Sequence, residues 1–290
     1  MRVALDAMGG DHAPTATVAG ALLAADAGLD VVLVGTPDML TAELQRAGAA
    51  GRLPIAAADE VVGMHEAVMA LRNKRTASVR VAAGLVASGQ ADAMVSAGST
   101  GATLVAALLS LGRVRGVRRP VLAAVLPTPA GDVVLADAGG SPDPRPEALV
   151  AYARMATAYA QARGCAAPSV GLLNVGSEAG KGTALVRHAF TLLHGSDGFV
   201  GNVEPAAVLA ARADVVITDG FTGNVFLKTL EAMAGDSGDT AGAAVLLGVA
   251  GEVLVAHGAA DASAVAAAVR TAAAVAGAGL WRRVERHLSA

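Results

Sequence analysis

Hydrophobic positions along this chain fall mainly in short unbroken runs rather than in strict alternation with polar positions. Runs of this kind are typical of strands with both faces covered, as in a parallel sheet. Between the runs, alanine- and leucine-rich stretches carry apolar residues at helical spacing. Strands are therefore expected at residues 3–5, 31–34, 93–96, 121–126, 133–136, 170–175 and 215–218, and helices at 13–27, 77–88, 100–111 and 146–162.

This alternation predicts an α/β protein, a three-layer α/β/α sandwich with a mostly parallel sheet. Before the last third of the chain, no linker, charge block or tandem repeat interrupts the pattern. A chain of 290 residues could hold two domains of average size, although one large α/β unit is equally ordinary. We expect a single α/β domain over residues 1–290.

Composition and charge narrow the function classes. Hydrophobic residues make up 54% of the chain, which is enough for a sizeable core. Aromatic residues make up only 2% and the net charge is −3, both of which argue against nucleic-acid binding. The single cysteine, Cys165, allows no intrachain disulfide, and no stretch reaches the roughly 20 unbroken apolar residues of a spanning helix. We expect a soluble, cytoplasmic protein.

Glycine- and hydroxyl-rich loops follow several of the expected strands. Ligands of open α/β sheets bind beyond the carboxyl ends of the strands, where glycine lets backbone N–H groups approach an anion. The helix that follows each loop adds its positive N-terminus. One such loop is usually an ordinary turn, but several at one edge predict a single polar pocket for an anion. The loops span residues 6–12, 96–101, 137–140, 174–178 and 218–224.

Several familiar motifs are absent from the sequence. Residues 176–183 resemble a P-loop, but the first glycine is one residue too close to the Gly-Lys pair and Gly182 separates Lys181 from Thr183. No expected strand leads into a dinucleotide fingerprint, and the chain has no Gly-x-Ser-x-Gly elbow. Because no His, Cys or carboxylate cluster has metal-ligand spacing, we expect neither a metal nor a cofactor.

The loops resemble the motifs of the PlsX family of acyl-carrier-protein:phosphate acyltransferases. Residues 6–14 (Asp-Ala-Met-Gly-Gly-Asp-His-Ala-Pro) resemble the family's N-terminal signature, and residues 96–102 resemble its Ser-Ala-Gly-Asn-Thr-Gly-Ala loop. Later motifs follow in the family's order at residues 171–182, 201–204, 213–216 and 219–231.

The resemblance implies a fold related to the phosphotransacetylases and to isocitrate dehydrogenase-like enzymes. It also implies the reaction of acyl-ACP with inorganic phosphate to give acyl phosphate and ACP, an early step of bacterial phospholipid synthesis. The implied partners are acyl carrier protein, inorganic phosphate, a second copy in a homodimer and a downstream membrane glycerol-3-phosphate acyltransferase. Peripheral attachment to the membrane is a further implication.

The chemistry needs donors for two anions rather than a protein nucleophile. Phosphate attacks the thioester itself, and the leaving thiol has a pKa of about 8.5, so its thiolate leaves readily. The site must position the reactants and stabilise phosphate and the developing oxyanion. We expect Lys181 to hold phosphate or the acyl-phosphate oxygens. Asn224 and Thr222 are expected to donate to phosphate or to the carbonyl oxygen, to cap a helix beginning near Val225, or to do both. His12 is expected to transfer a proton, unless it is structural.

The remaining candidates come from the same loops. Carboxylates facing phosphate would repel it, so we expect Asp6, Asp11, Asp137 and Asp219 to accept hydrogen bonds from backbone N–H groups or from Lys181. Besides Lys181, Asn224 and His12, the expected substrate- and phosphate-binding residues are Asp6, Gly9, Gly10, Asp11, Ser99, Thr100, Gly101, Asn174, Glu178, Asp219, Thr222, Gly223 and Lys228.

Two basic stretches could dock the acidic carrier. Residues 113–119 carry Arg115, Arg118 and Arg119, which we expect to be the docking residues, and residues 72–75 carry a second cluster. The alternative for both is a solvated charged face.

The sequence departs from the family pattern after Gly235. The family has a long helical insertion here, associated with dimer packing, the acyl pocket and membrane contact, whereas this chain has a short polar loop at residues 235–242. The family's His-Gly-Ser-Ser-Asp motif stands at residues 257–261 without its serines. Two alternatives therefore stay open: a short-chain acyl-CoA phosphotransacylase, and a non-catalytic paralogue that binds acyl-ACP.

Overall fold

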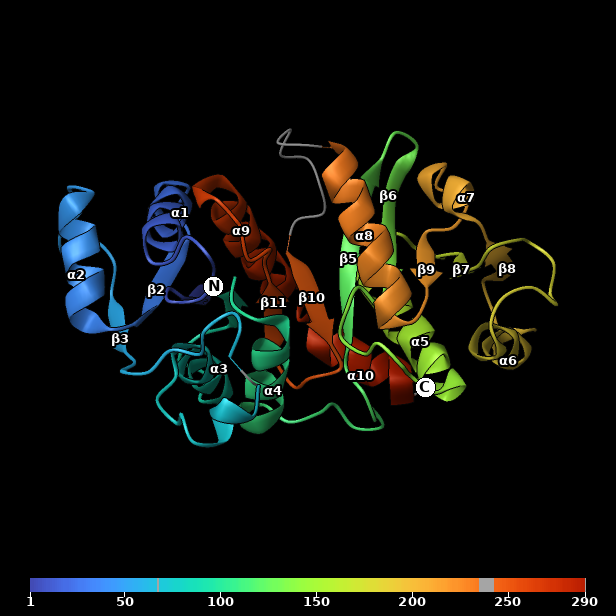
Figure 1. The fold of residues 1–290 in the computed structure, drawn as a ribbon, viewed down its shortest axis with the longest axis horizontal. Helices are drawn as coiled ribbons and strands as arrows, with labels where there is room; N and C mark the ends of the chain where they lie inside the picture. The colour runs from blue at the N-terminus through green and yellow to red at the C-terminus, as the bar shows by residue number, and fades with distance from the viewer. Residues whose placement is uncertain (67, 235–242, 290) are drawn as a thin grey trace. The chain divides into compact units, whose positions relative to one another are not determined.

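The computed structural model describes residues 1–66, 68–234 and 243–289, which form two compact units (Figure 1). Unit 1 comprises Met1–Gly112 and Val249–Gly279, and unit 2 comprises Arg113–Gly248 and Leu280–Ala290. The shortened loop at residues 235–242 lies outside the described residues. The expectation of a single domain stays a prediction.

Unit 1 is built on parallel strands in the order β3-β2-β1-β4-β11. Helices cover both faces of this sheet: α1, α2 and α9 lie on one side and α3 and α4 on the other (Figure 1). A short 3-10 helix, η1, precedes α3. The elements are β1 (Arg2–Asp6), α1 (Thr15–Asp26), β2 (Asp30–Gly35), α2 (Pro37–Arg46), β3 (Ile55–Ala57), η1 (Val68–Arg72), α3 (Ser78–Ala87), β4 (Ala93–Ser96), α4 (Thr100–Ser110), β11 (Glu252–Val255) and α9 (Ala262–Ala278).

Unit 2 has a mixed sheet in the order β10-β5-β6-β9-β7-β8. β5 runs antiparallel to both β10 and β6, while β6, β9, β7 and β8 are parallel. The elements are β5 (Val121–Thr128), β6 (Gly131–Ala136), α5 (Pro146–Ala162), β7 (Val170–Leu173), α6 (Ala184–Leu193), β8 (Phe199–Val203), α7 (Pro205–Leu209), β9 (Val215–Ile217), α8 (Gly220–Ala234), β10 (Ala244–Leu247) and α10 (Leu280–Ser289).

The core of each unit follows from the hydrophobic runs. Val3, Ala4 and Leu5 of β1 are fully buried, as a strand covered on both faces requires. In unit 2, α8 lies across β5 and β6 (Figure 1), where Phe226, Leu227 and Leu230 pack against a buried cluster that includes Val133 and Leu135. One face of α5 is also buried and includes Leu149, Tyr152 and Met155.

The predicted fold class is confirmed, and each expected strand and helix is present within a few residues. The sequence analysis missed four strands: β3, β8, β10 and β11. β3 has three residues, and β10 and β11 lie in the alanine-rich last third, where the apolar run was not resolved into strands.

Among the described helices, none is by itself long and apolar enough to cross a membrane. One bent pair, α9 followed by α10, passes the same test by length and composition only.

Candidate functional site

Three neighbouring strands of unit 1 end at the same edge of its sheet. Asp6 at the end of β1 pairs with Ser96 at the end of β4, and Ser96 also pairs with Val255 at the end of β11. The loops that follow are joined by a hydrogen bond from the Asp11 N–H to the Gly258 carbonyl oxygen, 2.8 Å long. Unit 1 therefore gathers the β1 and β4 loops, as predicted, together with a third loop after β11.

Asp6 is a buried carboxylate at the centre of this edge. Its Oδ2 accepts a hydrogen bond from the Ser96 hydroxyl at 2.7 Å, and its Oδ1 accepts one from the Met8 N–H at 3.3 Å. Ser96 Oγ in turn accepts the Gly98 N–H at 3.1 Å. Burial raises the pKa of Asp6 above its ordinary value, outweighing the hydrogen bonds that lower it. The Asp6 carboxylate thus connects the glycine-rich loop after β1 to the one after β4.

Gly9 lies in the tight space between these loops. A Cβ at this position would be 2.7 Å from Asp6 Oδ2 and 2.8 Å from the Gly98 nitrogen, so only glycine fits without a shift. The other predicted residues of this edge are more accessible. Asp11 and His12 are exposed in the turn before α1, while Gly10, Ser99, Thr100 and Gly101 are half-buried.

In unit 2, the loop between β7 and α6 carries Lys181. The buried Asn174 orders this loop, because its Nδ2 donates to the Lys181 carbonyl oxygen at 3.1 Å while its Oδ1 accepts the Val175 N–H at 2.8 Å. Asn202 at the end of β8 adds a hydrogen bond to the Glu178 carbonyl oxygen at 2.8 Å. Two buried amide side chains from neighbouring strands therefore fix the backbone on either side of Lys181.

The Lys181 side chain itself is exposed. Its Nζ lies 3.9 Å from Glu178 Oε1, and both side chains are more than half accessible to solvent. An ion pair this long and exposed holds the ammonium group weakly. The lysine is thus available to an anionic ligand on a loop whose backbone is fixed.

The loop after β6 is organised by Asp137, which is fully buried. Asp137 Oδ1 accepts hydrogen bonds from the N–H groups of Gly139 at 3.0 Å, Gly140 at 2.8 Å and Leu122 at 3.3 Å. Oδ2 accepts the Ser141 N–H at 2.7 Å. Burial raises the pKa of Asp137 to about 6, although these four N–H groups lower it. The expectation that this carboxylate bonds backbone N–H groups is confirmed.

The start of α8 corrects one prediction. The helix begins at Gly220, not near Val225, so Thr222 and Asn224 lie in its first turns and do not cap it. The capping interactions come from Asp219, whose Oδ1 accepts the Thr222 N–H at 2.8 Å and whose Oδ2 accepts the Thr222 hydroxyl at 2.7 Å. Asp219 thus satisfies an otherwise unpaired helix N–H group. Sequence reasoning placed the helix start too late because it treated the Gly-rich stretch as a loop.

The first turns of α8 rest on the Asp137 loop. The Gly220 N–H donates to the Ser141 carbonyl oxygen at 2.8 Å. Gly223 lies so close that a Cβ there would be 1.9 Å from the Asp137 carbonyl oxygen. On the other side, the Asn224 side chain packs over Gly139, where a Cβ would lie 3.3 Å from Asn224 Cγ. The position of Asn224 is therefore tied to the shape of this loop.

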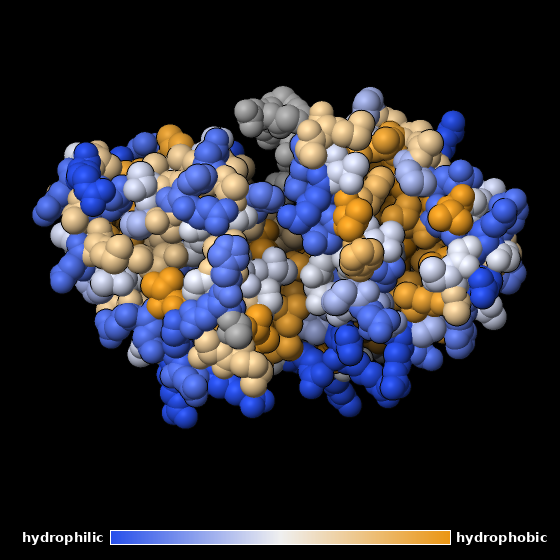
Figure 2. All heavy atoms as spheres, in the orientation of Figure 1, coloured by the Kyte–Doolittle hydropathy of each residue, from blue (hydrophilic) through white to orange (hydrophobic). Residues whose placement is uncertain are grey.

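α8 also exposes apolar side chains. Phe221 and Val225 are 66% and 51% exposed, and Figure 2 shows hydrophobic side chains among hydrophilic ones over this helix. Lys228, expected to bind substrate, is exposed one to two turns further along α8. The sequence analysis did not single out the apolar pair, although their spacing of four on one helix was a readable signal.

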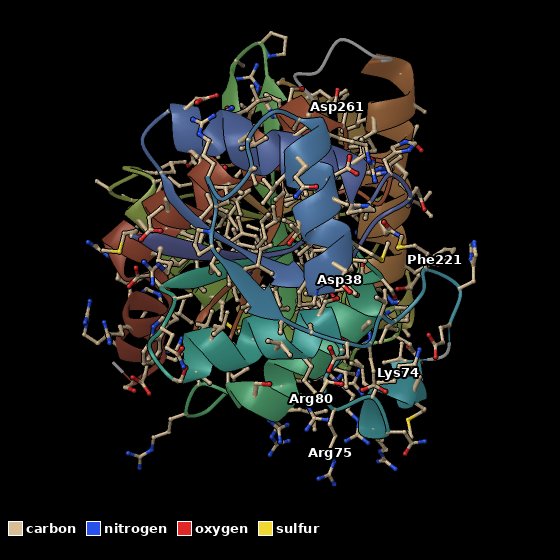
Figure 3. All side chains as sticks on the ribbon, turned by 90° about the vertical axis from the view of Figure 1, so that its left-hand side faces the viewer. Asp38, Lys74, Arg75, Arg80, Phe221 and Asp261 are labelled. Atoms are coloured by element: carbon tan, nitrogen blue, oxygen red, sulfur yellow. The ribbon has the colours of Figure 1, made fainter. Side chains whose placement is uncertain are left out.

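The predicted docking arginines lie on the connection between α4 and β5. Arg115, Arg118 and Arg119 are exposed there, and the Arg113 guanidinium donates to the Arg118 carbonyl oxygen at 2.9 Å. The second basic cluster lies at η1 in unit 1, where Lys74 pairs with Glu66 at 2.7 Å. In Figure 3, Lys74, Arg75 and Arg80 lie along one edge of unit 1, and Arg75 points outward.

The structure thus brings the predicted residues together in two sets. The β1 and β4 residues meet in unit 1. In unit 2 the loop after β6 contacts the start of α8, and the Lys181 loop follows β7, which pairs with β9 beside β6. The expectation that all five loops form one pocket stays a prediction. Sequence reasoning missed the β11 loop at unit 1, and the signal for it was the run Glu252–Val255 followed by His257 and Gly258.

Comparison with known proteins gives consistent matches along the chain. A family model described as "Fatty acid synthesis protein" matches residues 1–238. A phosphate acyltransferase of Thermus thermophilus is 45% identical over 325 aligned residues, covering 100% of this chain and 99% of the relative. The phosphate acyltransferase of Bacillus subtilis is 46% identical over 241 residues, covering 81% of this chain and 72% of the relative.

The Thermus alignment is longer than this chain, so the relative carries residues that this chain lacks. The family-model match ends at residue 238, inside the segment where the sequence analysis finds a shortened loop. The shortened loop at residues 235–242 stays a prediction.

Solved structures share the fold at low sequence identity. A phosphotransacetylase from Staphylococcus aureus has a TM-score of 0.67 and 17% identity, covering 95% of this chain and 94% of its own. A branched-chain phosphotransacylase from Enterococcus faecalis has a TM-score of 0.66 and 17% identity, covering 95% of this chain and 99% of its own. The predicted relation to the phosphotransacetylase fold is confirmed.

Proposed function

This chain belongs to the phosphate acyltransferase family, and from that premise we propose how its residues transfer an acyl group from acyl carrier protein to inorganic phosphate. It is an acyltransferase of fatty acid and phospholipid synthesis. An oxygen of phosphate attacks the thioester carbonyl carbon, the carbon–sulfur bond breaks, and its electron pair leaves with the carrier thiolate. The products are acyl phosphate and free carrier.

Lys181 and Asn224 have the central roles in this proposal. The Lys181 ammonium group binds phosphate and offsets the repulsion between the two anions that meet in the reaction. The Asn224 amide donates a hydrogen bond to the carbonyl oxygen as its negative charge develops. The Thr222 hydroxyl supplies a further donor.

The observation that best supports this assignment is the ordered loop around Lys181. Asn174 and Asn202 fix its backbone through hydrogen bonds of 3.1 and 2.8 Å, while the lysine side chain stays exposed. A charged group on a fixed backbone loses little further freedom when it binds a ligand, which is what a phosphate site needs.

The test follows thiol release and acyl phosphate together. Purified protein is mixed with palmitoyl-ACP with and without phosphate, and acyl phosphate is trapped with hydroxylamine. Wild-type protein should give both products only with phosphate, and Lys181→Ala should lower turnover at least about a hundredfold. Arg163→Ala, which removes an exposed guanidinium paired with Asp132, is the matched control. Near-wild-type turnover by Lys181→Ala would contradict the assignment.

A short-chain acyl-CoA substrate is the second candidate. The residues present in the Thermus relative but missing here favour it, because this chain has less protein with which to enclose a long chain. Acetyl-CoA in place of palmitoyl-ACP separates the two. Carrier binding without phosphate-dependent thiol release would instead support a non-catalytic role.

Carrier docking by Arg115, Arg118 and Arg119 belongs to the same proposal. Acidic carriers are drawn to exposed arginines, and this effect acts mainly on the association rate. Reversing the charges of Arg118 and Arg119 should raise the KM for palmitoyl-ACP while leaving the KM for phosphate unchanged. We also propose a homodimer with weak membrane attachment, which light scattering and flotation with anionic vesicles test.

A further inference from the structure

Asp137 lies where the loop after β6 meets the start of α8. Its carboxylate oxygens have different partners: Oδ1 accepts three N–H groups, and Oδ2 accepts that of Ser141. Ser141 is also the residue whose carbonyl oxygen accepts the Gly220 N–H at the start of α8. One oxygen of Asp137 therefore holds the strand-proximal part of the loop, and the other holds the part that supports the helix.

α8 contacts the loop after β6 on the side opposite the Asp137 carboxylate. Gly223 presses against the Asp137 carbonyl oxygen, and the Asn224 side chain packs over Gly139. Asn224 is thus separated from the Asp137 carboxylate by a single layer of loop backbone. A shift of that backbone has to move Asn224 or open the contact beneath it.

We propose that Asp137 is a positioning residue that acts through Asn224: its carboxylate holds residues 138–141 in the form on which the first turns of α8 rest. The inference rests on the role of Asn224 proposed above. Asp137 is buried beneath the loop backbone, so it acts on the reaction only through the groups that it holds. Its ionised form is the one that can accept all four N–H groups, because a protonated oxygen would turn a hydrogen towards one of them.

The charged and titratable groups near Asp137 do not change the conclusion that its ionised form holds the loop. Tyr152 of α5 faces it, and burial raises the pKa of that phenol, so it stays neutral. The positive charge of Arg119, which precedes β5, acts in the opposite direction and lowers the pKa of Tyr152. Since burial raises the Asp137 pKa to about 6, its protonation falls within a range where turnover can be measured.

Asp137→Asn is the sharpest variant. The Asn carbonyl oxygen can keep the three Oδ1 hydrogen bonds, whereas its NH₂ group then meets the Ser141 N–H, donor against donor. Turnover should fall about tenfold to a hundredfold, as expected for a small displacement of a catalytic group, with little change in the KM for phosphate. Asp132→Asn, which alters an exposed carboxylate on β6, the strand before Asp137, is the control and should match wild type.

A double-mutant comparison separates positioning from general structural damage. In an Asn224→Ala background, Asp137→Asn should have little further effect on kcat, because the group that it positions is gone. Effects of the two substitutions that simply multiply would overturn the proposal. The ratio of wild-type to Asp137→Asn turnover should rise with pH through about 6, which cancels the ionisation of phosphate itself. A ratio that does not change with pH would also overturn it.

A measurement without substrate keeps this inference independent of the proposed activity. In Asp137→Asn, amide hydrogen exchange followed by NMR should become faster at Ser141 and Gly220 and stay unchanged at Gly139 and Gly140. If the substitution changed the exchange rate by the same factor at all four positions, the positioning role would be contradicted, even in an active enzyme. If the wild-type protein makes no acyl phosphate, the proposed function fails, while the exchange pattern still decides whether Asp137 holds the loop.

Discussion

Each unit places a buried aspartate at the end of a central strand, but the two carboxylates are held differently. In unit 1, Asp6 at the end of β1 accepts hydrogen bonds from two hydroxyl groups, those of Ser96 and Ser78, and from the N–H groups of Met8 and Gly9. In unit 2, Asp137, directly after β6, is held by four backbone N–H groups. A hydroxyl can turn from donor to acceptor, whereas a backbone N–H can only donate. Unit 1 can therefore adapt to a neutral side chain, and unit 2 cannot adapt without moving its loop.

The largest expected effect concerns the glycine packed against each aspartate. In Gly223→Ala the new Cβ would lie 1.9 Å from a backbone oxygen, so α8 has to move, and we expect a loss of about 3 kcal/mol or more, or failure to fold. In Gly9→Ala one of the close atoms belongs to the Asp6 side chain, so a smaller loss of about 1–3 kcal/mol is expected. Urea unfolding measures both.

Gly84→Ala is the control for this pair. Gly84 lies inside α3 with open space around it, so alanine should stabilise the protein slightly, by about 0.5–1 kcal/mol. A Gly223→Ala protein as stable as wild type would show that α8 does not rest on the Asp137 loop.

The pH dependence of stability gives the next effect. The Asp137 pKa is about 6 in the folded protein against an ordinary value of 3.8, so between about pH 4 and pH 6 the folded state holds more protons than the unfolded state. The free energy of unfolding therefore falls as pH rises through this window, by about 3 kcal/mol at 1.36 kcal/mol per pKa unit. The raised pKa of Asp6 acts in the same direction.

Comparison of wild type with Asp137→Asn isolates the contribution of this group. The variant has no carboxyl to titrate, so its stability should change less between pH 4 and pH 8. At pH 8 the gain from removing a buried charge opposes the donor–donor contact at Ser141, so the midpoint of unfolding should stay near that of wild type. Identical pH dependence in the two proteins would rule out Asp137 as the titrating group.

How far the sequence could predict these features depends on the range of the interactions involved. The unbroken runs at residues 3–5 and 133–136 identified buried strands, because burial on both faces is a local property of composition. The glycine-rich loops at their ends followed from the same reading. Backbone N–H groups were predicted as the partners of Asp137, but the N–H of Leu122 could not be foreseen among them, because Leu122 belongs to an antiparallel neighbour that was not paired with β6 from the sequence.

The start of α8 shows a second limit. Glycines at 220 and 223 indicate a loop by their intrinsic preferences. The structure has a helix there because both glycines pack against the Asp137 loop, a contact between segments about 80 residues apart in the chain. Here tertiary packing overrides helix propensity, and this is also why the sequence alone suggests Thr222 and Asn224 as capping residues.

A smaller effect is expected from Asp6→Asn. The neutral amide removes the ionisation that burial disfavours, and the Ser96 hydroxyl can rotate to accept from the new NH₂ group. The variant should be about 1 kcal/mol more stable than wild type at pH 8. Asp6→Ala, which leaves the buried hydrogen-bonding groups unpaired, should be less stable than wild type. A destabilised Asp6→Asn protein would show that the Ser96 hydroxyl adapts to a neutral side chain no better than the four backbone N–H groups around Asp137 do.

The smallest effect is expected from the exposed carboxylates, one in each unit. Asp30 pairs with Arg2 at 3.0 Å and Asp132 pairs with Arg163 at 2.6 Å, and one or both side chains of each pair are about half exposed. Exposed pairs of this kind contribute about 0–1 kcal/mol, and salt screens them further. Asp30→Asn and Asp132→Asn should therefore unfold at the same urea concentration as wild type in about 0.5 M salt, where the Debye length is about 4 Å. A clear loss of stability in either variant would mean that its carboxylate has further contacts, and that the difference between Asp6 and Asp137 has to be measured against another baseline.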